Sequence, residues 1–127
     1  LGYTYKDGKR NGKWVKYYDS GKKREEGTYR NEKQEGVWIT WYENGQKQDE
    51  TIYKNGVEIK RIDWYENGNK RRERNHHEEN GKKDGLYTYW YENGQKTYEA
   101  IFDNGELISE KFQDIIGTVG ILEGLES

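Results

Sequence analysis

The sequence predicts an all-β protein, an elongated single-layer antiparallel meander of about four β-hairpin repeats of ~24 residues each, followed by a C-terminal capping segment. Three observations lead to this fold class. Two adjacent aromatic residues followed by a glycine-containing turn recur four times. The turn glycines stand 24, 23 and 26 residues apart, at Gly21, Gly45, Gly68 and Gly94. Self-similarity at such a period indicates a repeat architecture, and no helical periodicity interrupts it.

The clearest copy, residues 27–50, shows how one repeat makes a hairpin. Residues 38–42 are β-branched or aromatic, which favours a strand, and Asn44-Gly45 follows at once. Asn-Gly between two such runs is a strong hairpin signal, because both residues tolerate the positive φ of a type I′ turn. A second turn at residues 54–56 leads to the next aromatic strand. We therefore expect hairpin repeats over residues 1–106 and a non-repeat hydrophobic cap or tail over residues 107–127.

Alternation along each strand sorts the side chains onto two faces. Trp38, Thr40 and Tyr42 point one way, and Ile39 and Trp41 point the other. Rings therefore occupy both faces, and rings at equivalent positions can stack from repeat to repeat. Two columns complete the repeat, a glutamate and then a ring: Glu26, Glu50, Glu73 and Glu99; Tyr29, Tyr53, His76 and Phe102. We expect the glutamates to be cross-strand ion-pair partners of Lys/Arg-rich segments rather than catalytic groups.

Composition excludes several classes of protein. Leu, Ile, Val and Phe total only 20 of 127 residues, a fraction typical of disorder. The net charge of −2 and the regular spacing of 17 Tyr and Trp residues favour a thin aromatic core instead. The absence of cysteine excludes disulfides and thiolate metal sites. No run approaches the ~18 apolar residues of a transmembrane segment, and no signal peptide is visible. The missing initiator Met suggests a trimmed or processed chain.

Charge is distributed unevenly along the chain. Residues 1–30 carry a net charge of +5 and residues 86–127 a net charge of −6. Such a gradient bears on association and solubility rather than on fold. It fits a well-solvated surface, an acidic end that meets a basic partner, or an acidic end that stacks on the basic end of another copy.

The pattern fails in two places. The third repeat lacks the glycine found at positions 12, 36 and 85, and the connection over residues 75–81 is two residues longer than its counterparts. Loops carry function more often than strands do. The tail, residues 107–127, holds eight of the chain's eighteen Ile, Leu and Val residues. We expect it to cover the last hairpin; the alternative is a strand that pairs with a partner or a second copy.

No catalytic constellation is visible in the sequence. His76-His77-Glu78-Glu79 is the one cluster with metal-ligand residue types, but adjacent histidines on a strand point to opposite faces, so we expect a loop role and no metal. The glycines punctuate hairpins and open no helix, which argues against a phosphate cradle. The basic and aromatic stretch at 64–74 could stack on single-stranded nucleic acid, but the overall acidity disfavours it. We expect no enzyme and no cofactor.

The unit G-x-Y-x-N-x-K-x-x-G-x-W-x-x-W-Y-E-N-G-Q-K resembles the bacterial variant of the MORN repeat, and in particular the YwqK family of toxin–antitoxin antitoxins. The residues that carry the resemblance are Gly27-Thr28-Tyr29, Gly36, Trp38, 41–47 and 81–96. It covers roughly residues 2–106 and not the tail. The resemblance implies two-stranded β units in an elongated sheet, a binding rather than catalytic role, and an immunity protein that neutralises a cognate secreted toxin. The N-terminus does not reveal the localisation, and a bacterial cytoplasm is slightly favoured over the periplasm or secretion.

The resulting expectation is a non-catalytic, protein-binding repeat module, for which the resemblance implies the role of an antitoxin. The alternative is a scaffolding protein that self-associates through the ends of its sheet. The expected partner-facing residues are three strand aromatics and the irregular loop: Trp41, Trp64 and Trp90; His76, His77, Glu78 and Glu79.

Overall fold

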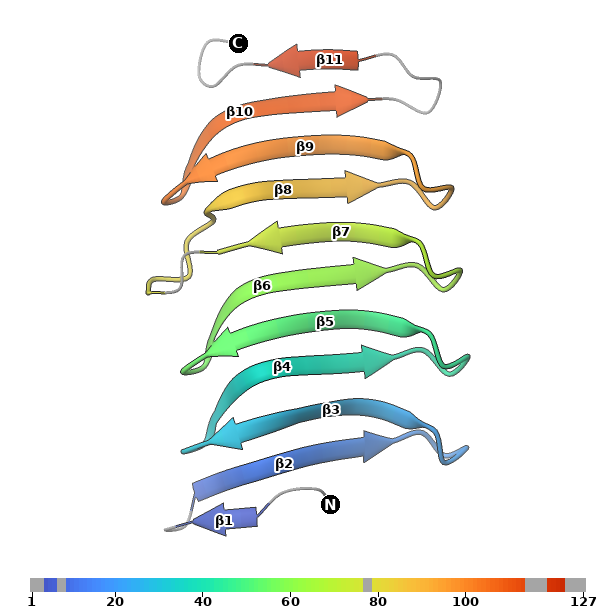
Figure 1. Ribbon diagram of the computed structural model, residues 1–127, viewed down its shortest axis with the longest axis vertical. Coiled ribbons are helices and arrows are strands. Elements are labelled where there is room, and N and C mark those ends of the chain that lie inside the picture. Colours follow the sequence, from blue (N-terminus) through green and yellow to red (C-terminus); the bar gives the residue numbers. More distant parts are fainter. Residues whose placement is uncertain (1–3, 7–8, 77–78, 114–118, 123–127) are drawn as a thin grey trace.

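The computed structural model describes residues 4–6, 9–76, 79–113 and 119–122, which form one long sheet (Figure 1). Within these ranges the sheet has eleven strands, ordered as in the sequence and each antiparallel to the next, and there is no helix. The strands are β1 (Thr4–Lys6), β2 (Lys9–Tyr17), β3 (Lys23–Arg30), β4 (Lys33–Trp41), β5 (Lys47–Lys54), β6 (Val57–Trp64), β7 (Lys70–Asn75), β8 (Gly85–Trp90), β9 (Lys96–Asp103), β10 (Glu106–Gln113) and β11 (Val119–Leu122). The predicted all-β antiparallel meander is therefore confirmed.

The two edges of the sheet use different turns, and the turn type expected at Asn44-Gly45 was wrong. Gly45 has a φ of 89°, but Asn44 keeps a negative φ, so this is a three-residue loop ending in a left-handed glycine. The Asn44 side chain holds the loop instead, because its Oδ1 accepts a hydrogen bond from the backbone N of Gln46 at 2.8 Å. The opposite edge carries the two-residue turns: Asn55 and Gly56 have φ values of 52° and 84°, both positive as a type I′ turn requires.

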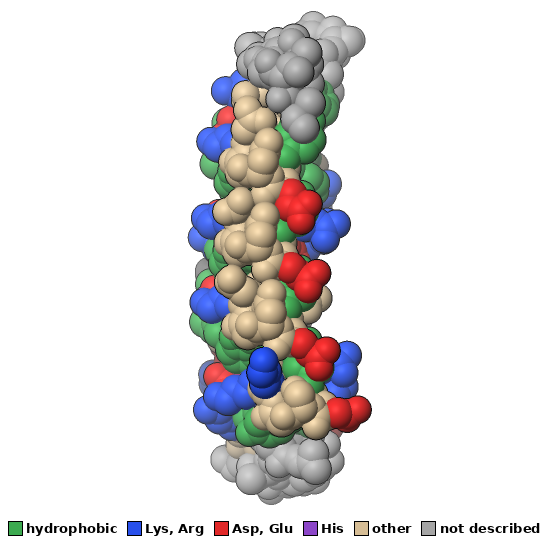
Figure 2. All heavy atoms as spheres, turned by 90° about the vertical axis from the view of Figure 1, so that its right-hand side faces the viewer, with side chains coloured by type: hydrophobic (Ala, Val, Ile, Leu, Met, Phe, Trp, Pro, Cys, Tyr) green, Lys and Arg blue, Asp and Glu red, His purple; other side chains and the backbone are tan. Residues whose placement is uncertain are grey.

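The sheet presents two faces, which we name the Trp38 face and the Trp41 face after alternating residues of β4. Viewed along the edge with the three-residue loops, hydrophobic side chains lie on both sides of the backbone ridge (Figure 2). The Trp38 face holds the buried apolar residues of the described chain: Trp38, Tyr87 and Ala100. Rings of neighbouring strands are in contact there with centroids 5.0 to 6.4 Å apart, edge-on or tilted, in place of the expected stacking of equivalent rings: Trp14–Tyr29, Tyr29–Trp38, Trp38–Tyr53, His76–Tyr87 and Tyr87–Phe102.

Hydrogen bonds from the Trp-Tyr-Glu-Asn-Gly signature join each repeat to the next. The hydroxyl of Tyr42 donates to the backbone O of Trp64 at 2.7 Å, and Asn44 Nδ2 donates to the backbone O of Glu66 at 3.1 Å. Two other tyrosines repeat the first contact: Tyr18 to Trp41 O and Tyr65 to Trp90 O. The signature residues thus serve the stacking of repeats as well as the hairpin itself.

The sheet is most weakly paired at the expected irregularity after the third repeat. Strands β7 and β8 share two ladder pairs, Arg72 with Tyr89 and Glu73 with Thr88, and one isolated bridge from His76 to Lys83. Neighbouring strand pairs such as β4 and β5 share six. The lengthened loop therefore separates two better-paired halves of the sheet.

The described part of the tail continues the meander, since β10 pairs with β9 and β11 pairs with β10. The division at residue 107 and the capping role of residues 107–127 stay predictions. Across the described ranges, no helix is long and apolar enough to cross a membrane.

Candidate protein-binding surface

The three tryptophans expected to face a partner form one row on the Trp41 face. Trp41, Trp64 and Trp90 end β4, β6 and β8. Because these strands are two positions apart in the sheet, neighbouring members of the row are about 10 Å apart. Alternation along β2 places Tyr17 at the head of the same row. The backbone O of each tryptophan accepts the tyrosine hydroxyl of the preceding repeat, which positions the row. Its role in binding stays a prediction.

A ladder of ion pairs lies beside this row. Lys47 Nζ is 3.3 Å from Glu50 Oε1 and 5.6 Å from the ring centroid of Trp64. Lys70 repeats the arrangement with Glu73 at 3.1 Å and Trp90 at 5.6 Å. The same i,i+3 pairing recurs in the first and last repeats: Lys23–Glu26 and Lys96–Glu99. The expected pairing of the glutamate column is confirmed, except that its nearest cation lies on the same strand rather than across it.

Cross-strand lysines make the second contact to this column. Lys60 lies 3.5 Å from Glu73, and Lys111 lies 3.4 Å from Glu99. The hydrogen bond from Lys96 holds the pKa of Glu99 below its ordinary value, although partial burial acts in the opposite direction. The named residues of the ladder, six lysines and four glutamates, carry a net charge of +2.

Sequence reasoning missed several exposed apolar side chains that share the face with the tryptophan row. Their exposed fractions lie between 46% and 56%: Tyr17, Val37, Leu86 and Ile101. Exposed apolar side chains gathered on one face are typical of a binding surface. The available signal was alternation, because Val37 and Leu86 stand an even number of residues before Trp41 and Trp90.

His76, at the start of the irregular loop, lies on the Trp38 face and not beside the tryptophan row. Its ring packs edge-on against Tyr87 with centroids 5.9 Å apart, and its Nδ1 lies 3.2 Å from the Tyr87 hydroxyl. Its Nε2 is 2.8 Å from Glu58 Oε2. Glu79 is exposed, and His77 and Glu78 lie outside the described residues. Of the expected residues, the three tryptophans and His76 therefore lie on opposite faces of the sheet, and the role of all of them in binding stays a prediction.

A cluster of charged residues in the third repeat also escaped sequence reasoning. Asp63 is 6% exposed on the Trp38 face and lies 3.1 Å from both Arg61 and Arg72. Arg61 stands where the other repeats carry a ring. Aligning the aromatic strands by their Trp-Tyr or Tyr-Tyr ends reveals the substitution, since Trp14, Trp38 and Tyr87 occupy the equivalent positions.

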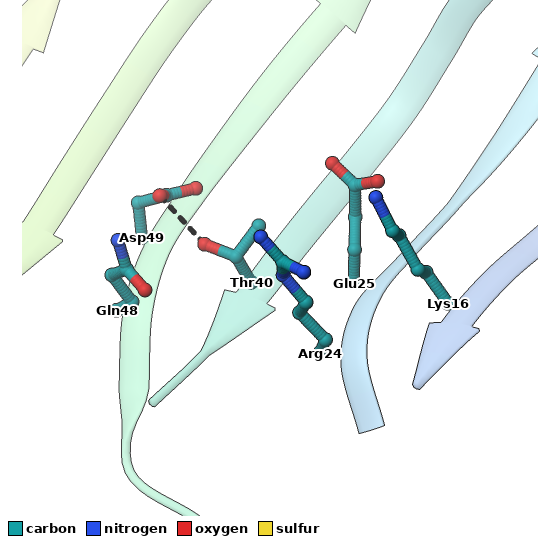
Figure 3. Close-up of a pocket in the computed structure, with 6 residues that line it drawn as sticks. All are labelled: Lys16, Arg24, Glu25, Thr40, Gln48 and Asp49. Atoms are coloured by element: carbon teal, nitrogen blue, oxygen red, sulfur yellow. Dashed lines mark hydrogen bonds between the residues drawn. The ribbon is translucent and has the colours of Figure 1, made fainter. Parts of the chain in front are cut away.

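A shallow polar depression of about 210 Å³ lies further along the same face, between β2 and β5 (Figure 3). It is lined by Lys16, Arg24, Glu25, Thr40, Gln48 and Asp49. Burial raises the pKa of Asp49, whereas the hydrogen bond that it accepts from Thr40 at 2.6 Å acts against that rise. The depression is smaller than the ~300 Å³ at which small-molecule pockets usually begin. It offers hydrogen-bonding groups and balanced charge, but no Ser, Cys or His nucleophile or base.

Over the described residues, no group of three or more His, Asp and Glu side chains is arranged to hold a metal ion.

Comparison with known protein families agrees with this geometry. The family described as the MORN repeat variant matches residues 10–31, 34–55 and 83–104, which together make up about half of the chain. The unmatched interval contains the third repeat, whose ring position is taken by Arg61. No curated protein matches the chain. MORN repeats generally form non-catalytic modules that bind proteins or membranes. The matched repeats and the hairpin sheet together show that the chain belongs to the MORN repeat variant family.

Proposed function

We propose that this chain is an antitoxin that binds its cognate toxin along the Trp41 face. The observation that carries the binding proposal is the row of partly exposed apolar side chains on that face, including Tyr17, Val37 and Leu86. The toxin identity rests on the resemblance to antitoxins with the same repeat. The acidic C-terminal third supports a basic partner.

The size of the Trp41 face suits a protein partner. Strands β2 to β9 span seven strand spacings, roughly 34 Å, and an eight-residue strand is roughly 26 Å long. The face therefore offers a projected area on the order of 900 Å², close to the roughly 800 Å² that each partner contributes to a standard interface. The described residues form a single layer, and none of them covers this face with a second layer, whereas domains usually bury each apolar face against one.

The test uses the gene next to this one as the source of the partner. The encoded protein should arrest growth when expressed alone, and co-expression of this chain should restore growth and co-purify with it. Val37→Glu and Leu86→Glu should each abolish both effects, because each places a charge among the exposed apolar side chains of the Trp41 face. Lys16→Glu is the matched control, since it reverses an exposed charge on the Trp38 face.

Circular dichroism and unfolding temperature would establish that all three variants stay folded. Rescue that persists in the Val37 and Leu86 variants would refute the assignment of the face. A neighbouring protein that neither arrests growth nor co-purifies would refute the antitoxin role.

A second candidate is a scaffold that self-associates through the ends of its sheet. Two observations favour it: β1 and β11 are the outer strands of the described sheet, and opposite net charges lie toward the two ends of the chain. Sedimentation velocity at low and high salt tests this candidate. Salt-sensitive assembly would support it, and a monomer at every salt concentration and protein concentration would refute it.

A further inference from the structure

The ring ladder of the Trp38 face is broken at β6. On one side it runs through Trp38 to Tyr53 on β5, and it resumes with His76 and Tyr87. The strand between them, β6, contributes Arg61 at the position where an aromatic ring would continue the ladder. The replacement of a ring by a guanidinium changes this part of the face from an apolar ladder to an ionic cluster.

Like charges face each other directly across two strands of this cluster. The register pairs Arg61 of β6 with Arg74 of β7, two positive charges. The next pair on this face, Asp63 with Arg72, has opposite charges. Side chains directly opposite each other in an antiparallel pair are near neighbours, and like charges at such positions repel. Negative charge between or above the two guanidinium groups would relieve this repulsion.

The protein's own carboxylates neutralise this cluster unequally. Asp63 contacts Arg61 and Arg72 at 3.1 Å each, and Asp49 contacts Arg61 at 3.4 Å. Arg74, in contrast, reaches Asp63 only at 4.0 Å. Its Nε–H is buried and has no hydrogen-bond partner among the described residues. A nearby carboxylate, Glu58, is in contact with His76 at 2.8 Å.

The cluster is nevertheless accessible from solvent. The side chains of Arg61, Arg72 and Arg74 are between 25% and 32% exposed, while the Asp63 carboxylate beneath them is 9% exposed. An incoming group would therefore meet guanidinium groups first. Guanidinium is a planar fork of donors that matches phosphate and carboxylate oxygens, often through two parallel hydrogen bonds.

We propose that Arg61, Arg72 and Arg74 form an oxyanion-binding site on the Trp38 face, which takes a phosphate or carboxylate group of a ligand. The oxyanion lies against the solvent-exposed sides of the facing Arg74 and Arg61 side chains and accepts hydrogen bonds from their guanidinium N–H groups. The site lies on the opposite face of the sheet from the tryptophan row, so it does not depend on the proposed toxin-binding surface.

The test follows the arginine Nε–H signals in two-dimensional ¹H–¹⁵N NMR spectra during titration. Sodium phosphate and sodium acetate are the two probes, and sodium chloride at matched ionic strength is the blank. We expect saturable shifts of the Arg61, Arg72 and Arg74 signals with one or both probes. The stronger probe indicates whether the natural group is a phosphate or a carboxylate. Signals from the exposed Arg24 and Arg30 should follow the chloride blank.

Variants of Arg74 test whether the arginine cluster binds the oxyanion. Arg74→Gln keeps a polar side chain but removes the charge, and it should weaken binding at least tenfold or abolish saturation. Arg74→Lys keeps the charge without the fork and should bind with intermediate strength. Arg30→Gln is the matched control and should bind like the wild type. Shifts that never saturate in the wild type, or an Arg74→Gln variant that binds like it, would overturn the proposal. The wild-type titration decides the matter even if a variant does not fold.

Discussion

Gly27→Ala is the substitution whose outcome depends most directly on how the repeats pack. Gly27 lies on β3 beneath the ring of Trp38, and a Cβ built there would be 2.0 Å from Trp38 Cδ2 and 2.2 Å from Cε2. Non-bonded carbon atoms do not approach so closely, so the ring must move. The ring is only 4% exposed and lies between Tyr29 and Tyr53, so it has little room to do so.

The expected loss of stability combines three contributions. Overpacking an interior site typically costs about 1–3 kcal/mol. Displacing the ring also breaks the hydrogen bond from Trp38 Nε1 to the backbone O of Thr28, 3.1 Å long, which contributes about 1 kcal/mol. Alanine in a strand, in contrast, stabilises the folded state by roughly 0.5–1 kcal/mol relative to glycine, which offsets part of this loss. The net destabilisation is about 2 kcal/mol, which lowers the unfolding temperature of a chain of this size by roughly 8 °C.

Urea unfolding followed by far-ultraviolet circular dichroism measures this effect in two backgrounds. In the Trp38→Val background the ring is gone, and Gly27→Ala should become neutral or stabilising. Gly36→Ala is the control: its φ is +72° and nothing lies within 4 Å of the added Cβ, so it should cost about 1 kcal/mol from backbone strain in both backgrounds. An equal penalty for Gly27→Ala with and without the ring would refute the packing argument.

Three further predictions concern the links between repeats, the turns and the ion-pair ladder. Tyr42→Phe should lower the free energy of unfolding by about 1 kcal/mol in urea titrations, because it removes the donor to Trp64 O; an unchanged midpoint would contradict the inter-repeat role. Asn55→Ala should cost about 1 kcal/mol at its positive φ, and Asn55→Gly should be tolerated, as thermal unfolding can measure; equal losses would show that φ is not the cause. Glu99→Gln should reduce stability at pH 7 by about 0.5 kcal/mol. Because the folded-state pKa of Glu99 is lowered, this contribution is present above its unfolded pKa near 4.5 and is lost as pH falls through the folded value, so urea midpoints of variant and wild type should converge at low pH.

Local sequence signals predicted the strands and the faces well because both depend on short-range geometry. Alternation correctly separated Trp38 from Trp41, since successive side chains of a strand must point to opposite faces. The same signals misjudged the turn at Asn44, because Asn-Gly is compatible with more than one hairpin loop. Its conformation depends on the side chain of Asn44, which bonds both its own loop and the next repeat.

The candidate surfaces were only partly predictable. The tryptophan row could be expected from the repeat, and alternation places Val37 and Leu86 on the same face, but their exposure required the structure. His76 was expected to continue the ring column and to belong to a partner-facing loop, and the structure places its ring against Tyr87 on the Trp38 face. The arginine cluster was missed because its members come from two strands, and Arg74 is unremarkable until the register sets it opposite Arg61.

The sequence by itself determined the repeat period, because the turn glycines recur along the chain. It also determined the order of strand and turn and the alternation of faces, because both follow from residues within one hairpin. Only the tertiary structure decided which side chains meet across strands: the tyrosine that holds the next repeat's carbonyl, the glycine that admits a tryptophan ring, and the arginines that face each other around Asp63. Those contacts join residues 11 to 25 positions apart. They depend on strand register, which no short stretch of sequence specifies alone.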